Sequence, residues 1–176
     1  MSNVSIRSET PADQETIRDL IVEVFRETYG SGDAEAGIVD EMRRQVDIGT
    51  YISLVAVLND TIVGHIFFSP VKLTDFPDIP VCVLGPVGVG RKWQKRGIGS
   101  LLIREGLEQC QGHGYRAVFT TGSLQYYLRF GFVPIGTTNL ETIFKTEHDM
   151  VMELESGLLR RVSGLVEYPE PWRVFL

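Results

Sequence analysis

The residues best suited to chemistry in this chain are a cluster of cations followed by glycines. Four of the six residues from 91 to 96 are positively charged, although the whole chain carries a formal net charge of -6. Gly97 and Gly99 come next and open an amphipathic run, so the pattern predicts a helix that begins in the glycine loop. Amides at a helix start lack partners and carry partial positive charge. The cluster therefore predicts a site for a polyanionic ligand held by its phosphate groups.

Two better-known phosphate loops do not fit these residues. A Walker loop needs a second glycine five residues after its first, but five residues after Gly90 the chain has Lys95. A dinucleotide fingerprint that uses Gly88 and Gly90 meets Trp93 where its third glycine belongs. A nucleic-acid surface would need a broader basic area, so no nucleic-acid partner is expected.

The loop instead resembles a known acyltransferase motif. The segment Gln94-Lys95-Arg96-Gly97-Ile98-Gly99 matches the Gln/Arg-x-x-Gly-x-Gly/Ala motif of the GCN5-related N-acetyltransferase (GNAT) family. Further on, Tyr126-Tyr127-Leu128-Arg129-Phe130-Gly131-Phe132 resembles that family's Tyr-x-x-x-Gly-Phe segment. Two motifs in order are a stronger indication than one. Together with the Leu84-Gly85-Pro86-Val87 lead-in, they resemble a poorly characterised bacterial branch of N-acetyltransferases.

This resemblance implies a fold of the α/β (α+β) class. One N-acetyltransferase domain is expected over residues 1–176, with residues 156–176 as a C-terminal extension. A central mixed, mostly antiparallel sheet with a splayed central strand would be covered by helices. The apolar residues 81–89 agree with that central strand, and Pro86 removes one amide from its pairing.

The resemblance also implies acetyl-CoA as the acetyl donor and no metal. Backbone groups of Val87 and Val89 would pair with the pantetheine arm like an added strand. Amides from Gln94 to Ser100 would hold the diphosphate. The cofactor-binding residues expected on this basis are Val87, Gly88, Val89, Gln94, Lys95, Arg96, Gly97, Ile98, Gly99 and Ser100.

The reaction implied is direct transfer of the acetyl group to a primary amine, without an acyl-enzyme. Tyr127, four residues before Gly131, matches the family's tyrosine and is the expected catalytic proton donor to the departing thiolate. The alternative is an ordinary core aromatic, a role expected more of Tyr126. No Asp or Glu occurs in residues 81–89, where many family members place a carboxylate. The base therefore stays open among Glu27, Asp75, Asp78 and His65.

Periodicity predicts the elements that must position these residues. Two apolar stripes predict helices near the N-terminus, the second with Ile38, Met42 and Val46 on one face. Asn59-Asp60 predicts a tight hairpin turn, and Ser69-Pro70 is expected to close its second strand. The expected strands cover residues 4–7, 51–58, 61–68, 81–89, 115–121, 132–135 and 150–154, the expected helices cover 11–28, 33–49 and 98–111 with a short one from 122, and the expected loops cover 72–80 and 139–147.

Length and composition limit the number of domains, the cellular location and the state of the cysteines. The chain has 176 residues with 43% hydrophobic and 23% charged residues, enough for one globular domain with a substantial core. It has no apolar run of membrane-spanning length and no secretory signal, so a cytoplasmic protein without a membrane partner is expected. Cys82 and Cys110 lack metal-like spacing and are expected to be buried, reduced thiols.

Partners and alternative functions stay open at this stage. The acidic balance favours a cationic amine acceptor whose identity is unknown, and the tail 156–176 is expected to cover the domain or to form a homodimer contact. A first alternative, an acyl-CoA-binding regulatory or catalytically inactive module, is favoured by the missing carboxylate. A second, an unrelated phosphate-ligand binding protein, requires the Tyr127 match to be accidental.

Overall fold

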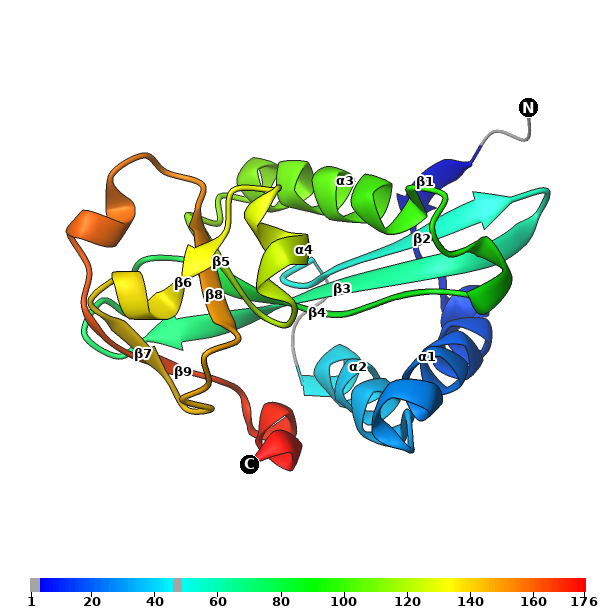
Figure 1. Cartoon of the computed structure of the whole chain (residues 1–176), viewed down its shortest axis with the longest axis horizontal. Coiled ribbons are helices and arrows are strands. Elements are labelled where there is room, and N and C mark those ends of the chain that lie inside the picture. Colours follow the sequence, from blue (N-terminus) through cyan, green and yellow to red (C-terminus); the bar gives the residue numbers. More distant parts are fainter. Residues whose placement is uncertain (1–3, 46–48) are drawn as a thin grey trace. The chain divides into compact units, whose positions relative to one another are not determined.

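The computed structural model describes residues 4–45 and 49–176, and within them the strands form a mixed, mostly antiparallel nine-stranded sheet accompanied by helices (Figure 1). This architecture confirms the expected fold class. The chain divides into two compact units, one of Met1–Phe68 and Pro86–Leu107 and the other of Ser69–Gly85 and Glu108–Leu176. The strands are β1 (Ser5–Ser8), β2 (Ile52–Leu58), β3 (Thr61–Leu73), β4 (Val81–Val89), β5 (Ala117–Thr121), β6 (Val133–Pro134), β7 (Leu140–Thr142), β8 (Asp149–Glu153) and β9 (Gly164–Glu167), and the α-helices are α1 (Gln14–Tyr29), α2 (Asp33–Gln45), α3 (Ile98–Gly112) and α4 (Leu124–Leu128).

The first unit is built on the β2–β3 hairpin. Its turn residues Asn59 and Asp60 have φ values of 48° and 59°, which is the left-handed conformation that the two-residue turn requires. β1 pairs antiparallel with β2, and the Gly90 amide donates to the Val63 carbonyl at 2.9 Å. The hairpin predicted from Asn59-Asp60 is therefore confirmed.

Helices cover both faces of this hairpin. α1 and α2 lie side by side on one face, and the first turns of α3 lie on the other (Figure 1). The predicted apolar stripes are core, since Ile17 and Ile21 of α1 and Ile38 and Met42 of α2 are at most 2% exposed. A Cβ on Gly106 of α3 would come within 2.3 Å of the Phe68 ring, so this glycine lets helix and strand approach closely. The predicted Val46 position on the second stripe lies outside the described residues.

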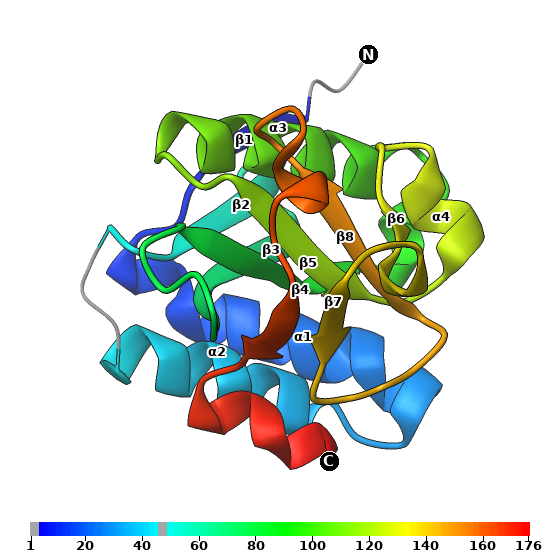
Figure 2. The same ribbon diagram turned by 90° about the vertical axis from the view of Figure 1, so that its left-hand side faces the viewer.

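The second unit contains the shorter strands. β4 pairs parallel with β5 from Val81↔Ala117 to Val83↔Phe119, and β5 pairs antiparallel with β8. Figure 2 shows β5 beside β8, and β7 beside β9. The Cys82 and Cys110 thiols are both buried and unlinked, with their sulfur atoms 3.7 Å apart, which confirms the prediction of reduced thiols.

Two boundary predictions were wrong, and both for the same reason. β3 continues past Ser69-Pro70 to Leu73, because Lys72 and Leu73 pair with Glu167 and Val166 of β9. The predicted loop 139–147 contains β7, which pairs with β9 as well. Within the tail 156–176, β9 belongs to the sheet, and a 3-10 helix at Glu170–Phe175 follows it. No helix in the described residues is long and apolar enough to cross a membrane.

Candidate functional site

The glycine loop at the start of α3 has backbone angles typical of an anion-binding concavity. Lys95 and Gly97 have φ values of 61° and 83°, so left-handed residues alternate with Arg96 between them. Such alternation turns successive amides toward one point and creates an anion-binding concavity. The first helical bond runs from the Leu101 amide to the Gly97 carbonyl at 3.0 Å. Amides before that bond have no acceptor within the helix and remain available to a phosphate.

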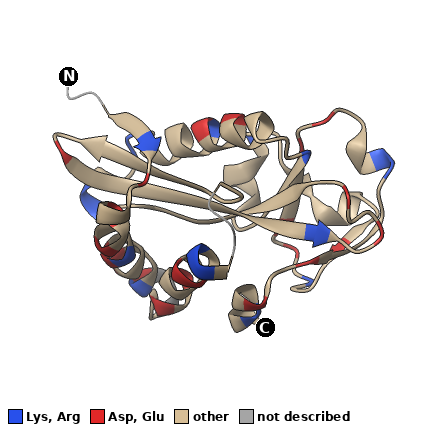
Figure 3. Cartoon of the chain, turned by 180° about the vertical axis from the view of Figure 1, so that it is seen from behind, with Lys and Arg blue, Asp and Glu red and all other residues tan. Residues whose placement is uncertain are grey.

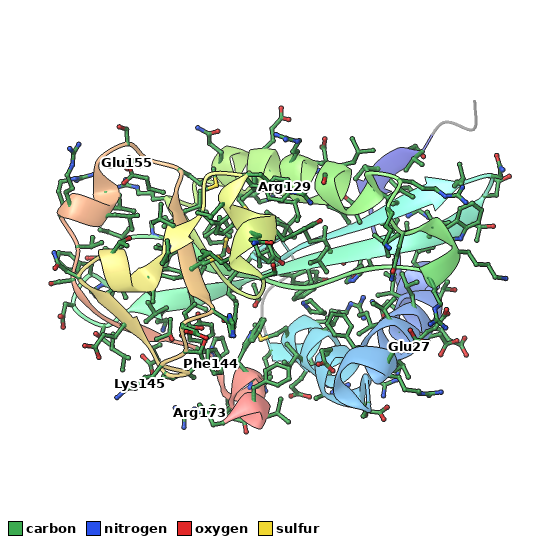
Figure 4. All side chains as sticks on the ribbon, in the orientation of Figure 1. Glu27, Arg129, Phe144, Lys145, Glu155 and Arg173 are labelled. Atoms are coloured by element: carbon green, nitrogen blue, oxygen red, sulfur yellow. The ribbon has the colours of Figure 1, made fainter. Side chains whose placement is uncertain are left out.

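The cationic side chains of this loop lie at its surface. Arg91 forms an ion pair with Glu27 at 2.6 Å, with 72% and 55% of the two side chains exposed. Figure 4 shows Glu27 on α1, at whose C-terminal end it meets the loop. The Arg96 guanidinium lies 5.1 Å from the centre of the Trp93 ring, whereas Lys95 is exposed. Exposed ion pairs contribute little energy, so these side chains add little to the phosphate site expected at the backbone amides.

The strand residues expected to hold the cofactor lie beside this loop in the same unit. Val87 and Val89 are half-buried, and Gly88 is buried against Val24 of α1. The Gln94 side chain folds back and donates from Nε2 to the Val89 carbonyl at 3.0 Å, which joins the end of β4 to the loop. Ile98 is 3% exposed and anchors the first turn of α3 in the core, while Gly99 and Ser100 are half-buried at its start.

Tyr127 lies on α4 in the second unit and is 7% exposed. Its ring meets Phe132 nearly edge-on with centroids 5.5 Å apart, and a Cβ on Gly122 would come within 2.9 Å of that ring. Tyr126 is only half-buried, with the Arg129 guanidinium 4.1 Å from the centre of its ring. The expectation that Tyr126 is the more natural core residue was therefore wrong, because α4 turns Tyr127 onto Phe132 and Tyr126 toward Arg129.

His65 lies in a buried polar network of the first unit. Its Nε2 is 2.9 Å from the Ser53 hydroxyl, which donates its proton to the Glu9 carboxylate. The imidazole must then donate from Nε2, and among the described residues its Nδ1 has no partner. Burial, and then the charge of Arg43, lowers the pKa of His65 to about 3. His65 is therefore neutral near pH 7 and wholly enclosed, which favours the core interpretation over a catalytic one.

Arg43 holds this network together. It donates to both Glu9 oxygens, from Nε at 2.9 Å and from Nη2 at 2.6 Å, and both side chains are at least nine-tenths buried. Arg43 also contacts Asp40 at 3.1 Å. Figure 3 shows positively and negatively charged residues interspersed along α1 and α2, and Arg43 and Asp40 belong to α2. Buried charges are stable only when paired in this way.

The remaining candidates for the base are distributed over both units. Asp75 and Asp78 are exposed in the loop that follows β3, and Glu27 is held in its ion pair with Arg91. Within residues 4–45 and 49–176, no three His, Cys, Asp or Glu side chains gather as metal ligands would. The carboxylate base thus stays unassigned.

Sequence reasoning missed the side chains that surround the irregular part of β4. Gly85 has a φ of 152°, and the Trp172 ring lies where its side chain would stand, with Cη2 3.1 Å from that position. The Trp172 indole N–H donates to the Ser69 hydroxyl at 3.2 Å. The sequence does show a tryptophan at the end of the proline-containing segment Tyr168-Pro169-Glu170-Pro171-Trp172. It could not show which residues Trp172 contacts, because these are distant in sequence.

Known proteins resemble either most of the chain or about half of it. The model of the acetyltransferase (GNAT) family matches residues 15–132. The uncharacterized N-acetyltransferase YhbS of Escherichia coli is 31% identical over 97% of this chain and 99% of its own. A second Escherichia coli protein, the uncharacterized N-acetyltransferase YjhQ, is 34% identical over 57% of this chain and 56% of its own.

Solved structures agree with these relatives. The crystal structure of Escherichia coli YhbS in complex with CoA has a TM-score of 0.87 at 31% identity and covers 98% of this chain and 93% of its own. A GNAT family acetyltransferase from Brucella melitensis in complex with acetyl-CoA has a TM-score of 0.81 at 32% identity, with 98% and 99% covered.

Proposed function

Because the chain belongs to the acetyltransferase (GNAT) family and is an N-acetyltransferase, we propose that it takes acetyl-CoA as the donor and acetylates a cationic primary amine. The observation that carries this proposal is the backbone concavity at residues 95–97, joined to the end of β4 within one compact unit. Relatives above 30% identity were crystallised with CoA and with acetyl-CoA, which supports the same ligand here.

The donor would be held mainly by backbone groups. Amides from Gln94 to Ser100 would hold the diphosphate, since those at the start of α3 precede its first helical bond. The pantetheine arm would lie along Val87 and Val89 as an added strand. We propose further that both units form one acetyltransferase domain, because β3, β4 and α3 run through both and the relatives cover nearly the whole chain.

The chemical step needs two proton movements. A primary amine is almost entirely protonated near pH 7, so it must lose a proton before it attacks the thioester. The leaving thiolate must gain one. Tyr127 is the proposed donor to that sulfur, since its ring is held rigidly between Phe132 and Gly122. No Asp or Glu occurs in residues 81–89, so the amine proton would leave through water.

A second candidate function rests on that missing carboxylate. The chain would then bind acyl-CoA as a regulatory or catalytically inactive module, with the same loop and strand but no route for the amine proton. Both functions predict CoA binding, and only the enzyme predicts turnover.

The deciding experiment measures release of free CoA thiol from acetyl-CoA across a panel of primary amines, including diamines, amino acid amides and peptides. We expect acceptor-dependent release that grows with the positive charge of the acceptor. Gly99→Glu is the matched control, because it places bulk and negative charge in the phosphate concavity and should abolish release. Tight CoA binding by the wild-type chain without release on any amine would favour the inactive module.

The proposal includes no metal ion. A chelator should therefore leave the rate of acetyl transfer unchanged, and a rate that depends on an added divalent cation would contradict it. Cys82 and Cys110 are neighbouring free thiols, which supports a location in a reducing compartment such as the cytoplasm.

A further inference from the structure

The C-terminal tail reaches β4 directly after the residues that pair with β5. The register of β4 with β5 ends at Val83↔Phe119, and the Thr120 hydroxyl then donates to the Leu84 carbonyl at 3.2 Å. Gly85 follows with a φ of 152°, a conformation that side-chain-bearing residues rarely adopt. The break in β4 is therefore located at Gly85, directly before Pro86.

Trp172 fills the space left by the missing side chain of Gly85. Its Cη2 lies 3.1 Å and its Cζ3 3.7 Å from the position that a Cβ would take. The other end of the indole is fixed, because its N–H donates to the Ser69 hydroxyl of β3 and both residues are buried. The indole thus contacts β3 and β4 at the break, and its orientation is set by a hydrogen bond.

Aromatic neighbours hold Trp172 in place. The Tyr168 ring lies 5.9 Å from Trp172 and 4.9 Å from Phe144, centroid to centroid, in edge-on geometry. Figure 4 shows Phe144 beside the terminal turn that carries Arg173. The segment is also anchored upstream, since β9 pairs with Lys72 and Leu73 of β3. Such contacts fix the indole before any ligand binds.

We propose that Trp172 is a positioning residue for the acetyl donor, which holds the break at Gly85 so that Val87 and Val89 present their backbone groups to the pantetheine arm. This inference rests on the proposed function and assigns a role to the C-terminal tail. Without the indole, Gly85 regains conformational freedom that must be removed again on binding. The resulting loss of affinity should affect ligands that contact the strand after Pro86. Ligands that contact only the phosphate loop should keep their affinity.

The test compares CoA with ADP, which carries a diphosphate but no pantetheine arm, by titration calorimetry on the full chain. For Trp172→Ala we expect CoA affinity to fall roughly tenfold, the cost of re-ordering about one backbone residue, with ADP affinity unchanged. Trp172→Phe should recover most of the CoA affinity. Phe175→Ala is the matched control, because its ring lies at the exposed end of the same aromatic group, 44% exposed.

Kinetics give a second readout. The KM for acetyl-CoA should rise with Trp172→Ala while kcat at saturating donor changes little. If Trp172→Ala does not fold by circular dichroism, Trp172→Leu replaces it with the same expected split between CoA and ADP. Equal losses for CoA and ADP, or a CoA affinity within about twofold of wild type, would overturn the positioning role. A wild-type chain that binds no CoA would overturn the proposed function as well.

Discussion

At the residue scale, we expect phosphate binding to depend on backbone amides more than on charged side chains. Lys95 and Arg96 are exposed, and exposed charge pairs contribute only about 0–1 kcal/mol each. The shape of the loop backbone depends on the left-handed conformations of Lys95 and Gly97. We therefore expect the glycines to matter more for binding than the cationic side chains that precede them.

This ranking gives a direct prediction for the loop. Gly99→Glu should weaken acetyl-CoA binding by at least about a hundredfold, whereas Lys95→Ala and Arg96→Ala should each weaken it by no more than about fivefold. Titration calorimetry measures the affinities, and circular dichroism confirms that each variant is folded. A loss with either alanine variant as large as that with Gly99→Glu would show that a cationic side chain contacts the phosphate directly.

Tyr127 and Tyr126 provide a matched pair for the chemical step. Tyr127→Phe keeps the buried ring against Phe132 and removes only the hydroxyl, so the fold and most of the acetyl-CoA affinity should remain. If the hydroxyl protonates the thiolate, turnover should fall roughly 10²–10⁴-fold, the range for loss of a general acid. Single-turnover kinetics must measure it, since slow product release conceals chemical defects.

Tyr126→Phe is the control, because that ring is half-buried beneath Arg129 on the same helix. Its turnover should stay within a few-fold of wild type. An unaltered chemical step in Tyr127→Phe would assign protonation of the thiolate to water or another group.

At the element scale, Asp149 joins the ends of three strands in the second unit. Its carboxylate is 1% exposed at the start of β8 and accepts hydrogen bonds from Thr121 at the end of β5 and from Thr142 at the end of β7. The Thr146 amide and hydroxyl add two more, at 3.0 and 3.1 Å. The same turn fixes the approach to α4, since the Gly122 amide donates to the His148 carbonyl.

Asp149→Asn should therefore destabilise the fold. An amide has one oxygen where the carboxylate has two, so buried donors lose their acceptor at about 1–3 kcal/mol each. Urea unfolding followed by circular dichroism should show a lower midpoint with an unchanged slope. Asp60→Asn is the control, because asparagine suits the exposed left-handed turn of β2–β3 and should leave the midpoint unchanged. A wild-type midpoint in Asp149→Asn would contradict the role given to this carboxylate.

At the scale of the whole molecule, buried His65 links stability to pH. The groups that face it are Ser53, Glu9 and Arg43, and burial followed by the Arg43 charge lowers its folded-state pKa to about 3. In the unfolded chain the imidazole pKa is about 6.5. Between about pH 3 and about pH 6.5 the imidazole is therefore protonated in the unfolded state and neutral in the folded state. The contribution of His65 to the free energy of unfolding should be fully present above about pH 6.5 and should be lost progressively toward about pH 3.

The prediction is that the free energy of unfolding falls by about 1 kcal/mol between pH 7.5 and pH 5.5. Denaturant titrations at the two pH values measure it. His65→Gln keeps a donor for Ser53 without an ionisable ring, so its difference between the two pH values should be much smaller. An equal difference in His65→Gln and wild type would assign the pH dependence to other groups.

The sequence alone determined the features that depend on near neighbours. Asn59-Asp60 specifies its turn because few residues accept positive φ, and the stripes of α1 and α2 follow from the period of the helix. The glycine loop and the two ordered motifs gave the family and the phosphate concavity in the same way. Each turn, stripe or motif depends on residues within about two turns of one another, and the family assignment adds only the order of two such motifs.

Tertiary structure decided everything that depends on which distant segments meet. β9 extends β3 past Pro70, Trp172 packs on Gly85, and Glu9 with Arg43 makes His65 a core residue. Local patterns predict that a segment is strand-like or apolar, and they carry no information about its partner. Two remote segments pair only when their contacts stabilise the fold by more than the entropy lost in closing the long loop between them. The residues around the break in β4 are therefore known only from the folded chain.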